Sequence, residues 1–272
     1  MPILNKDMTL CISLSGRPSN IGTRFHNYLY DALGLNYIYK AFSTDDLPAA
    51  IAGVRGLGIR GCAVSMPFKE AVIPLVDTLD ASAAAIESIN TIVNTDGHLT
   101  AYNTDYLAIQ RLVERHGVAP CSVVVRGSGG MAKAVVAALH GAGFHDGTVL
   151  ARNVAAGQAL AAQYGWQVTD DASTVSADLI VNVTPLGMAG GPEAGERSFS
   201  DAAIAAASVV WDVVALPSET PLIRAARAAG KPVITGAEVI AIQAEEQFVL
   251  YTGVRPSAEL VAEASAFSLA QP

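Results

Sequence analysis

The sequence predicts an α/β protein with two domains, and three observations support this prediction. Short apolar runs alternate with helical patterns along most of the chain, which is typical of a largely parallel sheet. The alternation restarts after Cys121 with a strand, a glycine turn and a helix. The length of 272 residues is comfortable for two small domains, and 51% hydrophobic residues supply enough apolar side chains for their cores.

The first third of the chain predicts one α/β domain. Strands are expected at 9–14, 36–42 and 59–65, and helices at 25–33, 45–54 and 82–87. Gly34 follows the first helix, where glycine commonly ends a helix. Asp96-Gly97 lies between two further strands at 91–94 and 98–102, and this dipeptide is a strong hairpin signal.

The rest of the chain predicts a second α/β unit and a helical end. A helix that opens at Asn103-Thr104-Asp105 and runs to about His116 is expected to link the domains. Strands are expected at 121–126, 148–151, 178–183, 208–214 and 232–235, with helices between them. Two final helices, 237–251 and 257–269, have no strand between them and can pack on the first domain. The glycine-rich loop 189–200 is either a mobile cover over a ligand or a connector.

Charge and cysteine usage exclude several classes of protein. The net charge is −8, and a negative surface repels nucleic acid and acidic lipid, so neither partner is expected. Cys11, Cys62 and Cys121 are widely spaced and form neither a disulfide framework nor a metal-ligand pattern. The N-terminus lacks a basic start before a long apolar run. We therefore expect a cytoplasmic protein with reduced thiols and no metal site.

A glycine turn after the strand at 121–126 is the first candidate site. A strand that feeds a glycine-rich turn into a helix presents free backbone N–H groups and the positive end of the helix to a pyrophosphate. The residues expected to bind a dinucleotide here are Gly127, Ser128, Gly129, Gly130, Met131 and Ala132. A plain tight turn is the alternative, but the position between strand and helix favours a cofactor.

Arg152 and Asn153 follow the next strand and bear on the choice of cofactor. Proteins that bind NAD usually carry Asp or Glu at this position, to accept a hydrogen bond from the ribose 2′-hydroxyl. A guanidinium at Arg152 can instead pair with a 2′-phosphate, which an acid would repel. This favours NADP. The alternative is that Arg152 is a solvated surface residue and that NAD binds.

Lys69 and Asp105 are the residues of the first domain that can carry acid–base chemistry. Lys69 ends the segment Ser65-Met66-Pro67-Phe68-Lys69, whose apolar neighbours can desolvate an amine and lower its pKa. A surface lysine is the more common situation. Asp105 can equally belong to the N-terminal cap of a helix. The spacing of the two residues does not show that they meet.

These pieces together resemble the shikimate dehydrogenase family along nearly the whole chain. The matching motifs, in chain order, are Ser65-Met66-Pro67-Phe68-Lys69, Ser88-Ile89-Asn90-Thr91, Asn103-Thr104-Asp105, Gly127-Ser128-Gly129-Gly130, Asn182-Val183-Thr184-Pro185-Leu186-Gly187-Met188, Asp212, Pro217, Thr220-Pro221-Leu222, Gly236, Gln243-Ala244 and Phe248. The resemblance implies a catalytic pair, Lys69 and Asp105. It also implies that NADP is the cofactor, in agreement with Arg152.

The resemblance implies further binding residues on both domains. Substrate would contact Ser65, where the family usually has threonine, together with Asn90 and Gln243. Cofactor would also contact Thr184, Val213 and Gly236. Residues 1–105 plus 236–272 would form the substrate-binding catalytic domain, and residues 106–235 the doubly wound Rossmann domain.

The departures from the family pattern concentrate at the site for the substrate carboxylate. The usual Ser-x-Ser pair is replaced by Asn20 and Gly22, and the usual tyrosine by Ala215. Thr23 is one of the nearby residues able to substitute for the missing hydroxyls. The usual second cation after Arg152 falls at Ala156, which reduces the expected preference for NADP over NAD. The pattern is similar to a shikimate dehydrogenase-like subgroup rather than to the enzyme of aromatic amino acid biosynthesis.

The resemblance therefore predicts an NADP-dependent oxidoreductase that exchanges hydride with a ring hydroxyl or ketone. The expected substrate is a cyclic polyol acid, shikimate or a relative, with weak activity on shikimate itself. Two alternatives stay open: a quinate- or other cyclitol-type dehydrogenase, and a dinucleotide-binding sensor without chemistry. A monomer or a homodimer is expected.

Overall fold

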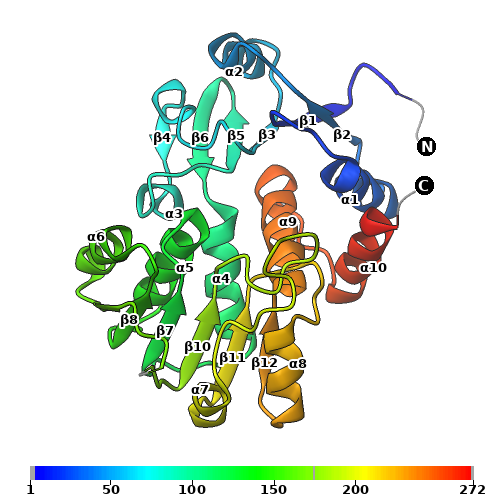
Figure 1. Cartoon of the computed structure of the whole chain (residues 1–272). Helices are drawn as coiled ribbons and strands as arrows, with labels where there is room; N and C mark the ends of the chain where they lie inside the picture. Colours follow the sequence, from blue (N-terminus) through cyan, green and yellow to red (C-terminus); the bar gives the residue numbers. More distant parts are fainter. Residues whose placement is uncertain (1–3, 174, 271–272) are drawn as a thin grey trace. The chain divides into compact units, whose positions relative to one another are not determined.

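The structure is a computed structural model that describes residues 4–173 and 175–270. It contains two sheets with helices around them, which confirms the predicted α/β class (Figure 1). Contacts divide the chain into two compact units. Unit 1 comprises Met1–Thr104 and Gln243–Pro272, and unit 2 comprises Asp105–Ile242. The assignment of substrate to one unit and cofactor to the other remains a prediction.

Unit 1 is built on a mixed sheet. Its elements are β1 (Thr9–Leu14), α1 (Asn20–Ala32), β2 (Tyr37–Phe42), α2 (Leu47–Gly56), β3 (Gly61–Val64), the short helix η1 (Ile73–Leu75), β4 (Thr78–Leu79), α3 (Ala81–Ala84), β5 (Thr91–Thr95), β6 (His98–Tyr102) and α10 (Ala258–Leu269). The strand order is β2-β1-β3-β5-β6-β4. β1 runs parallel to β2 and β3, whereas β5 runs antiparallel to both β3 and β6.

The unit 1 sheet is parallel in three of its five strand pairings, and the two antiparallel pairings are both made by β5, the first strand of the predicted hairpin. Asp96 and Gly97 both adopt positive φ angles, 52° and 87°, which a tight hairpin turn requires. The Gly97 amide also donates to Asn94 Oδ1 at 2.9 Å. The hairpin that the sequence predicts at Asp96-Gly97 is thereby confirmed.

The first helix also begins earlier than expected. α1 starts at Asn20 rather than at Phe25, because Ser19 has an extended backbone at the N-cap and the turn after it is already helical. Asn20, Gly22 and Thr23 therefore lie in the opening turns of a helix rather than in a loop. The backbone N–H groups of Asn20 and Gly22 thus lie in the first turn, at the positive end of the helix.

Helices cover the unit 1 sheet. α2 covers one face, where its Leu47, Ile51 and Val54 meet strand residues such as Ile12 and Cys62. On the other face α1 packs against α10 and β2. There Gly61 of β3 faces the ring of Tyr251, and a Cβ at this glycine would lie 2.4 Å from the ring.

Unit 2 is a doubly wound parallel sheet, as predicted. Its elements are α4 (Thr104–Arg115), β7 (Val123–Arg126), α5 (Gly130–Gly141), β8 (Gly147–Leu150), α6 (Val154–Tyr164), β9 (Gln167–Thr169), β10 (Leu179–Asn182), α7 (Asp201–Ala206), β11 (Val209–Asp212), α8 (Pro221–Ala228), β12 (Val233–Thr235) and α9 (Gly236–Thr252), the last of which continues into unit 1. All pairs are parallel in the order β12-β11-β10-β7-β8-β9 (Figure 1).

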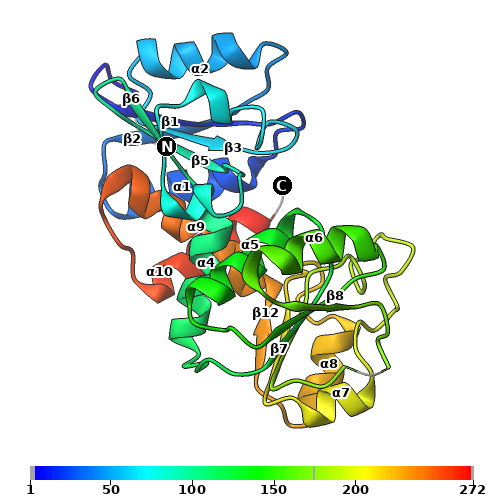
Figure 2. The same ribbon diagram turned by 90° about the vertical axis from the view of Figure 1, so that its left-hand side faces the viewer.

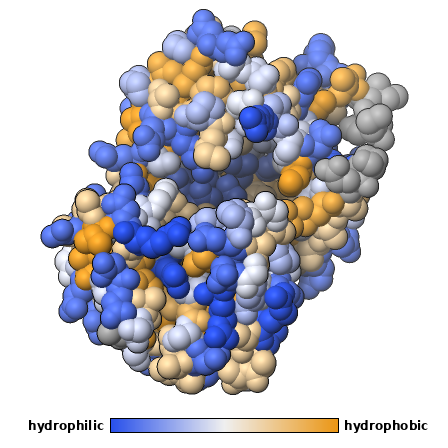
Figure 3. Space-filling view, viewed as in Figure 1, coloured by the Kyte–Doolittle hydropathy of each residue, from blue (hydrophilic) through white to orange (hydrophobic). Residues whose placement is uncertain are grey.

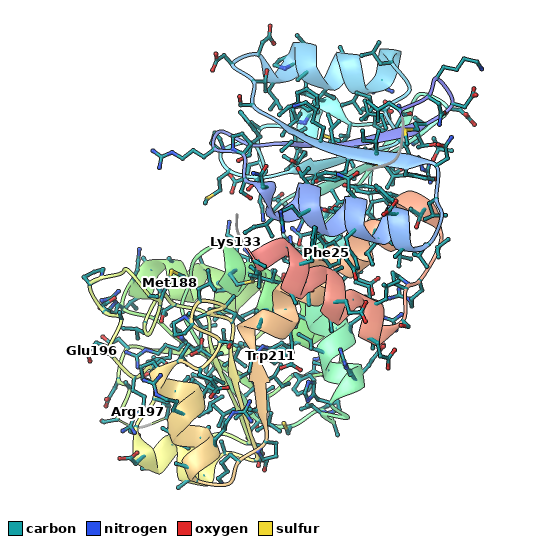
Figure 4. The ribbon with its side chains drawn as sticks, turned by 90° about the vertical axis from the view of Figure 1, so that its right-hand side faces the viewer. Phe25, Lys133, Met188, Glu196, Arg197 and Trp211 are labelled. Atoms are coloured by element: carbon teal, nitrogen blue, oxygen red, sulfur yellow. The ribbon has the colours of Figure 1, made fainter. Side chains whose placement is uncertain are left out.

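Alternate residues of the central strands enter two different cores. Val123 and Val125 pack with α4, α5, α6 and α9, whereas Val124 packs with α7 and α8. Figure 2 shows α5 and α6 on one side of the strands and α7 and α8 on the other. Trp211 of β11 is buried among these elements (Figure 4). A sheet covered on both faces needs near-continuous apolar strands, which is the pattern in the sequence.

The surface in Figure 3 mixes hydrophilic residues with scattered hydrophobic ones. No helix within residues 4–173 and 175–270 combines the length and the hydropathy that a membrane-spanning helix needs.

Candidate functional site

A pocket of about 300 Å³ opens where the strands of unit 2 end. The predicted cofactor residues that line it are Gly127, Ser128, Gly129, Arg152, Asn153 and Thr184. They follow β7, β8 and β10, and the carboxyl ends of parallel strands meet at one edge of the sheet. The remaining predicted residues lie at element ends: Gly130, Met131 and Ala132 open α5, Val213 follows β11 and Gly236 begins α9.

The glycines of the turn have two different reasons to lack a side chain. Gly127 has a φ of +132°, and a Cβ there would lie 2.7 Å from Val183 Cγ2, so the protein itself requires glycine. At Gly129 and Gly130 no atom of the described residues, apart from the chain neighbours and the backbone of the helix itself, lies within 4 Å of the position a Cβ would take. This open space in front of the N-terminus of α5 fits a pyrophosphate that approaches the backbone closely.

Arg152 and Asn153 have separate tasks at the end of β8. Asn153 caps α6, since its Oδ1 accepts from the Ala156 amide at 3.1 Å. The Arg152 side chain is 78% exposed, and its Nη1 lies 3.2 Å from Glu193 Oε1. The Arg152 guanidinium pairs with only one carboxylate oxygen, so its other N–H groups can donate to a phosphate.

A buried polar network shapes the loops beside this pocket. Thr184 Oγ1 donates to Asn182 Oδ1 at 2.6 Å, and Asn182 Nδ2 donates to Asp212 Oδ1 at 3.0 Å. Thr220 Oγ1 donates to Asp212 Oδ2 at 2.7 Å. Burial raises the pKa of Asp212 to about 6, although these hydrogen bonds counteract the shift. The network holds Thr184 at the pocket, and the sequence pattern alone did not reveal it.

In unit 1, Asn90 is the polar residue whose geometry points most clearly to a ligand. Its Oδ1 accepts from the Thr104 amide at 2.8 Å, from Thr104 Oγ1 at 3.1 Å and from Thr91 Oγ1 at 2.9 Å. Its Nδ2 is buried and has no hydrogen-bond partner among the described residues. A buried donor without a partner is costly, so this amide is suited to a ligand hydroxyl.

Comparisons with known proteins agree with this geometry. Residues 20–92 match the model of the shikimate dehydrogenase substrate binding domain. The chain is 59% identical over 98% of its length to a shikimate dehydrogenase-like protein of Haemophilus influenzae, 98% of which is covered. It is 36% identical to a shikimate dehydrogenase (NADP(+)) of Citrifermentans bemidjiense, over 91% of this chain and 90% of the other.

The chain belongs to the shikimate dehydrogenase family. The members of this family are oxidoreductases that act on CH–OH groups with NADP, so the chain is an enzyme of that class. Among solved structures, quinate dehydrogenase from Corynebacterium glutamicum in complex with NAD superposes with a TM-score of 0.86 at 28% identity, with 97% of this chain and 99% of that one covered. The predicted family and fold are thereby confirmed.

Of the family's predicted catalytic residues, Lys69 lies in the turn segment between β3 and η1, and Asp105 lies at the start of α4. The backbone carbonyl of Lys69 accepts from the Ile89 amide at 3.0 Å, which holds the Lys69 segment beside Asn90. Asp105 is buried in the first turn of α4. Because Lys69 belongs to unit 1 and Asp105 to unit 2, their pairing stays a prediction.

The predicted substrate residues of the family are distributed over unit 1. Ser65 follows β3, with its amide bonded to the Leu14 carbonyl at 2.9 Å, and Gln243 lies in α9. Thr23 Oγ1 is buried and has no hydrogen-bond partner among the described residues, so it is suited to replace a missing hydroxyl of the carboxylate site. Asn20 stands about one turn earlier in the same helix, and Gly22 immediately precedes Thr23.

Gln247 is a residue of this region that the sequence analysis missed. Its Nε2 donates to Thr91 Oγ1 at 2.9 Å, and its Oε1 lies 3.3 Å from His26 Nε2. Thr91 in turn donates to Asn90. Gln247 stands one helical turn after Gln243, so the two share a helix face, and this spacing was the available signal.

Proposed function

We propose that this enzyme transfers hydride between NADP(H) and a ring hydroxyl or ketone of shikimate or a related cyclic hydroxy acid, with weak activity on shikimate itself. The open space at Gly129 and Gly130, next to Arg152 in one pocket, carries the cofactor part of this proposal. A relative named shikimate dehydrogenase (NADP(+)) supports it.

The chemistry that bound NADP supplies is hydride exchange at the carbon that bears the hydroxyl. Lys69 and Asp105 hold and move the hydroxyl proton. Asn90 Nδ2 donates to a neighbouring ring hydroxyl, while its Oδ1 is occupied by Thr91 and Thr104. Gln243 orients another hydroxyl.

Weak activity on shikimate follows from the altered carboxylate site. Asn20 and Gly22 replace two hydroxyl donors, and Ala215 replaces a third. A charge-assisted hydrogen bond contributes about 1.5–3 kcal/mol, so loss of two would weaken carboxylate binding by several orders of magnitude. Thr23 compensates for part of this loss through its buried hydroxyl. The fold shared with a quinate dehydrogenase favours quinate-type acids as the second candidate substrates.

The catalytic assignment is tested by Lys69→Ala, with turnover followed through the absorbance of NADPH. We expect turnover to fall about 10²-fold or more, with little change in substrate KM, because the proton relay acts in the transition state. Lys6→Ala is the matched control, since the Lys6 side chain is 89% exposed and pairs with its neighbour Asp7. Unchanged turnover in Lys69→Ala would remove this residue from the mechanism.

The substrate assignment is tested by a screen of shikimate, quinate and neutral cyclitols with both NADP and NAD. We expect shikimate to be a weak substrate, because the carboxylate site has lost donors, and another cyclic hydroxy acid to be turned over faster. Efficient turnover of shikimate alone would overturn this expectation and restore the biosynthetic role. Tight NADP binding without turnover of any compound would instead favour a sensor.

A further inference from the structure

Arg126 is a charged residue at the end of an otherwise apolar buried strand. It follows Val123, Val124 and Val125, which are at most 3% exposed, and immediately precedes the glycine turn. The Arg126 side chain is half-buried, and its Nη1 donates to the Ser198 carbonyl. Strand ends of this kind usually carry apolar residues, so the burial of a guanidinium here needs an explanation.

Arg126 and Arg152 reach the same pocket from neighbouring strands. Arg126 pairs in register with Leu150 of β8, two residues before Arg152, and both arginines line the pocket of about 300 Å³. Burial lowers the pKa of Arg126, and the positive charge of Arg152 lowers it further. Two like charges near each other in a half-buried pocket create a site for an anion.

Glu193 supplies a carboxylate to this pair in the structure. Its Oε1 lies 3.2 Å from Arg152 Nη1, and its charge raises the pKa of Arg126. The Glu193 backbone carbonyl accepts from the Gly187 amide at 3.0 Å, so a rotation about the side-chain bonds can remove the carboxylate without moving the loop. Asp170 also lines the pocket, but it follows β9, one strand further from Arg126.

We propose that Arg126 and Arg152 together bind the 2′-phosphate of NADP, and that Glu193 is an internal carboxylate which this phosphate displaces. The proposal rests on the proposed use of NADP. Arginine forks match the oxygens of a phosphate, and two forks can hold one phosphate from two sides. Arg126 thereby supplies the second cation that the sequence lacks at Ala156.

Glu193 also gives the site a means to accept NAD. A carboxylate beside the ribose accepts a hydrogen bond from the 2′-hydroxyl that NAD carries in place of the phosphate. Arg152 and Glu193 together thus serve either cofactor, and the carboxylate reduces the preference for NADP. Removal of the Glu193 charge should therefore increase this preference.

The test measures binding of adenosine 2′,5′-bisphosphate and of 5′-AMP to the whole protein by calorimetry, because these fragments differ in the 2′-phosphate and need no turnover. We expect Arg126→Met to weaken binding of the bisphosphate about tenfold or more, the effect of one charge-assisted hydrogen bond, and to change AMP binding less than about twofold. We expect Glu193→Gln to strengthen binding of the bisphosphate severalfold and to weaken binding of AMP, because the 2′-hydroxyl of AMP loses a charged acceptor.

Two residues of the same loop provide matched controls. Glu196 is exposed, and Arg197 pairs with Asp201 at 2.6 Å; both lie at the outer edge of the loop in Figure 4. Glu196→Gln and Arg197→Met should leave the ratio of the two affinities unchanged. Arg126→Lys keeps the positive charge but loses the planar guanidinium, so it should weaken binding of the bisphosphate by less than Arg126→Met. It replaces Arg126→Met in the test if that variant does not fold.

The outcomes separate this proposal from the proposed function. If the wild-type protein does not prefer the bisphosphate over AMP, the use of NADP fails. If Arg152→Met removes the preference while the Arg126 variants retain it, NADP use stands and the role of Arg126 is refuted. Equal weakening of both fragments by Arg126→Met, or an unchanged bisphosphate affinity in Glu193→Gln, also overturns the proposal.

Discussion

The buried imidazole of His26 should make the stability of this protein depend on pH. Its side chain is 1% exposed, stacks on Tyr39 with ring centroids 4.4 Å apart, and has its Nε2 3.3 Å from Gln247 Oε1. Burial lowers the pKa of His26 from 6.5 to about 4, although the bond to Gln247 counteracts the shift. In the unfolded chain the imidazole titrates normally.

The magnitude and sign of the effect follow from these two values. A shift of about 2.5 pKa units (6.5 − 4) corresponds to about 3 kcal/mol. Between pH 6.5 and pH 4 the unfolded chain binds a proton that the folded protein does not, so the free energy of unfolding falls as pH falls. The contribution of neutral His26 is complete above pH 6.5 and is lost towards pH 4. Between pH 7 and pH 5 it amounts to about 2 kcal/mol.

Asp212 acts in the opposite direction over an overlapping range. Burial raises its pKa from 3.8 to about 6, so between these values the folded protein holds a proton that the unfolded chain has lost. This group stabilises the protein by about 1 kcal/mol as pH falls from 7 to 5. The wild-type protein should therefore lose only about 1 kcal/mol over this range, since the two contributions partly cancel.

The assay is urea denaturation at pH 7 and pH 5 of the wild type, His26→Gln and Asp212→Asn. The glutamine cannot titrate and retains an amide near Gln247, so His26→Gln should become about 1 kcal/mol more stable on acidification. Asp212→Asn should instead lose about 2 kcal/mol. If the stability of His26→Gln changes with pH in parallel with that of the wild type, the buried imidazole does not titrate as argued.

Two further predictions concern glycines, one beside open space and one packed against an aromatic ring. Gly129→Ala should weaken binding of NADP, measured by calorimetry, because the added Cβ would occupy space proposed for the cofactor. The free energy of unfolding should stay within about 0.5 kcal/mol of wild type, because the Cβ would contact no other part of the protein. Unchanged NADP binding would contradict the placement of the cofactor. Gly61→Ala should lower the free energy of unfolding by about 1–3 kcal/mol in urea denaturation, because its Cβ would lie 2.4 Å from the Tyr251 ring. Wild-type stability in that variant would show that the Tyr251 ring can move away freely.

The cofactor half of the candidate site could be predicted from the sequence in most of its parts. Val123–Arg126, the glycine turn and α5 follow each other directly in the chain, so local pattern shows both the elements and the site between them. Arg152 was found because the ends of neighbouring parallel strands meet at a known edge. Arg126 and Glu193 were missed, since a residue before the turn and a residue in the loop 189–200 converge only after folding.

The substrate half of the candidate site was harder to predict from the sequence, because its contacts join distant parts of the chain. The sequence did not show that Gln247 supports Thr91 and Asn90, or that α1 begins at Asn20. The short strands β4 and β9 were also missed, because two or three residues are too few for a period of two to be recognised.

By itself the sequence determined the α/β class, the parallel sheet of unit 2 and the turn that presents backbone N–H groups to a ligand, because each depends on the order and polarity of neighbouring residues. Only the tertiary structure decided which polar atoms are left without partners, such as Asn90 Nδ2, and which charges share a pocket, such as those of Arg126 and Arg152. Those properties depend on register and burial, which arise when strands far apart in the chain pack side by side.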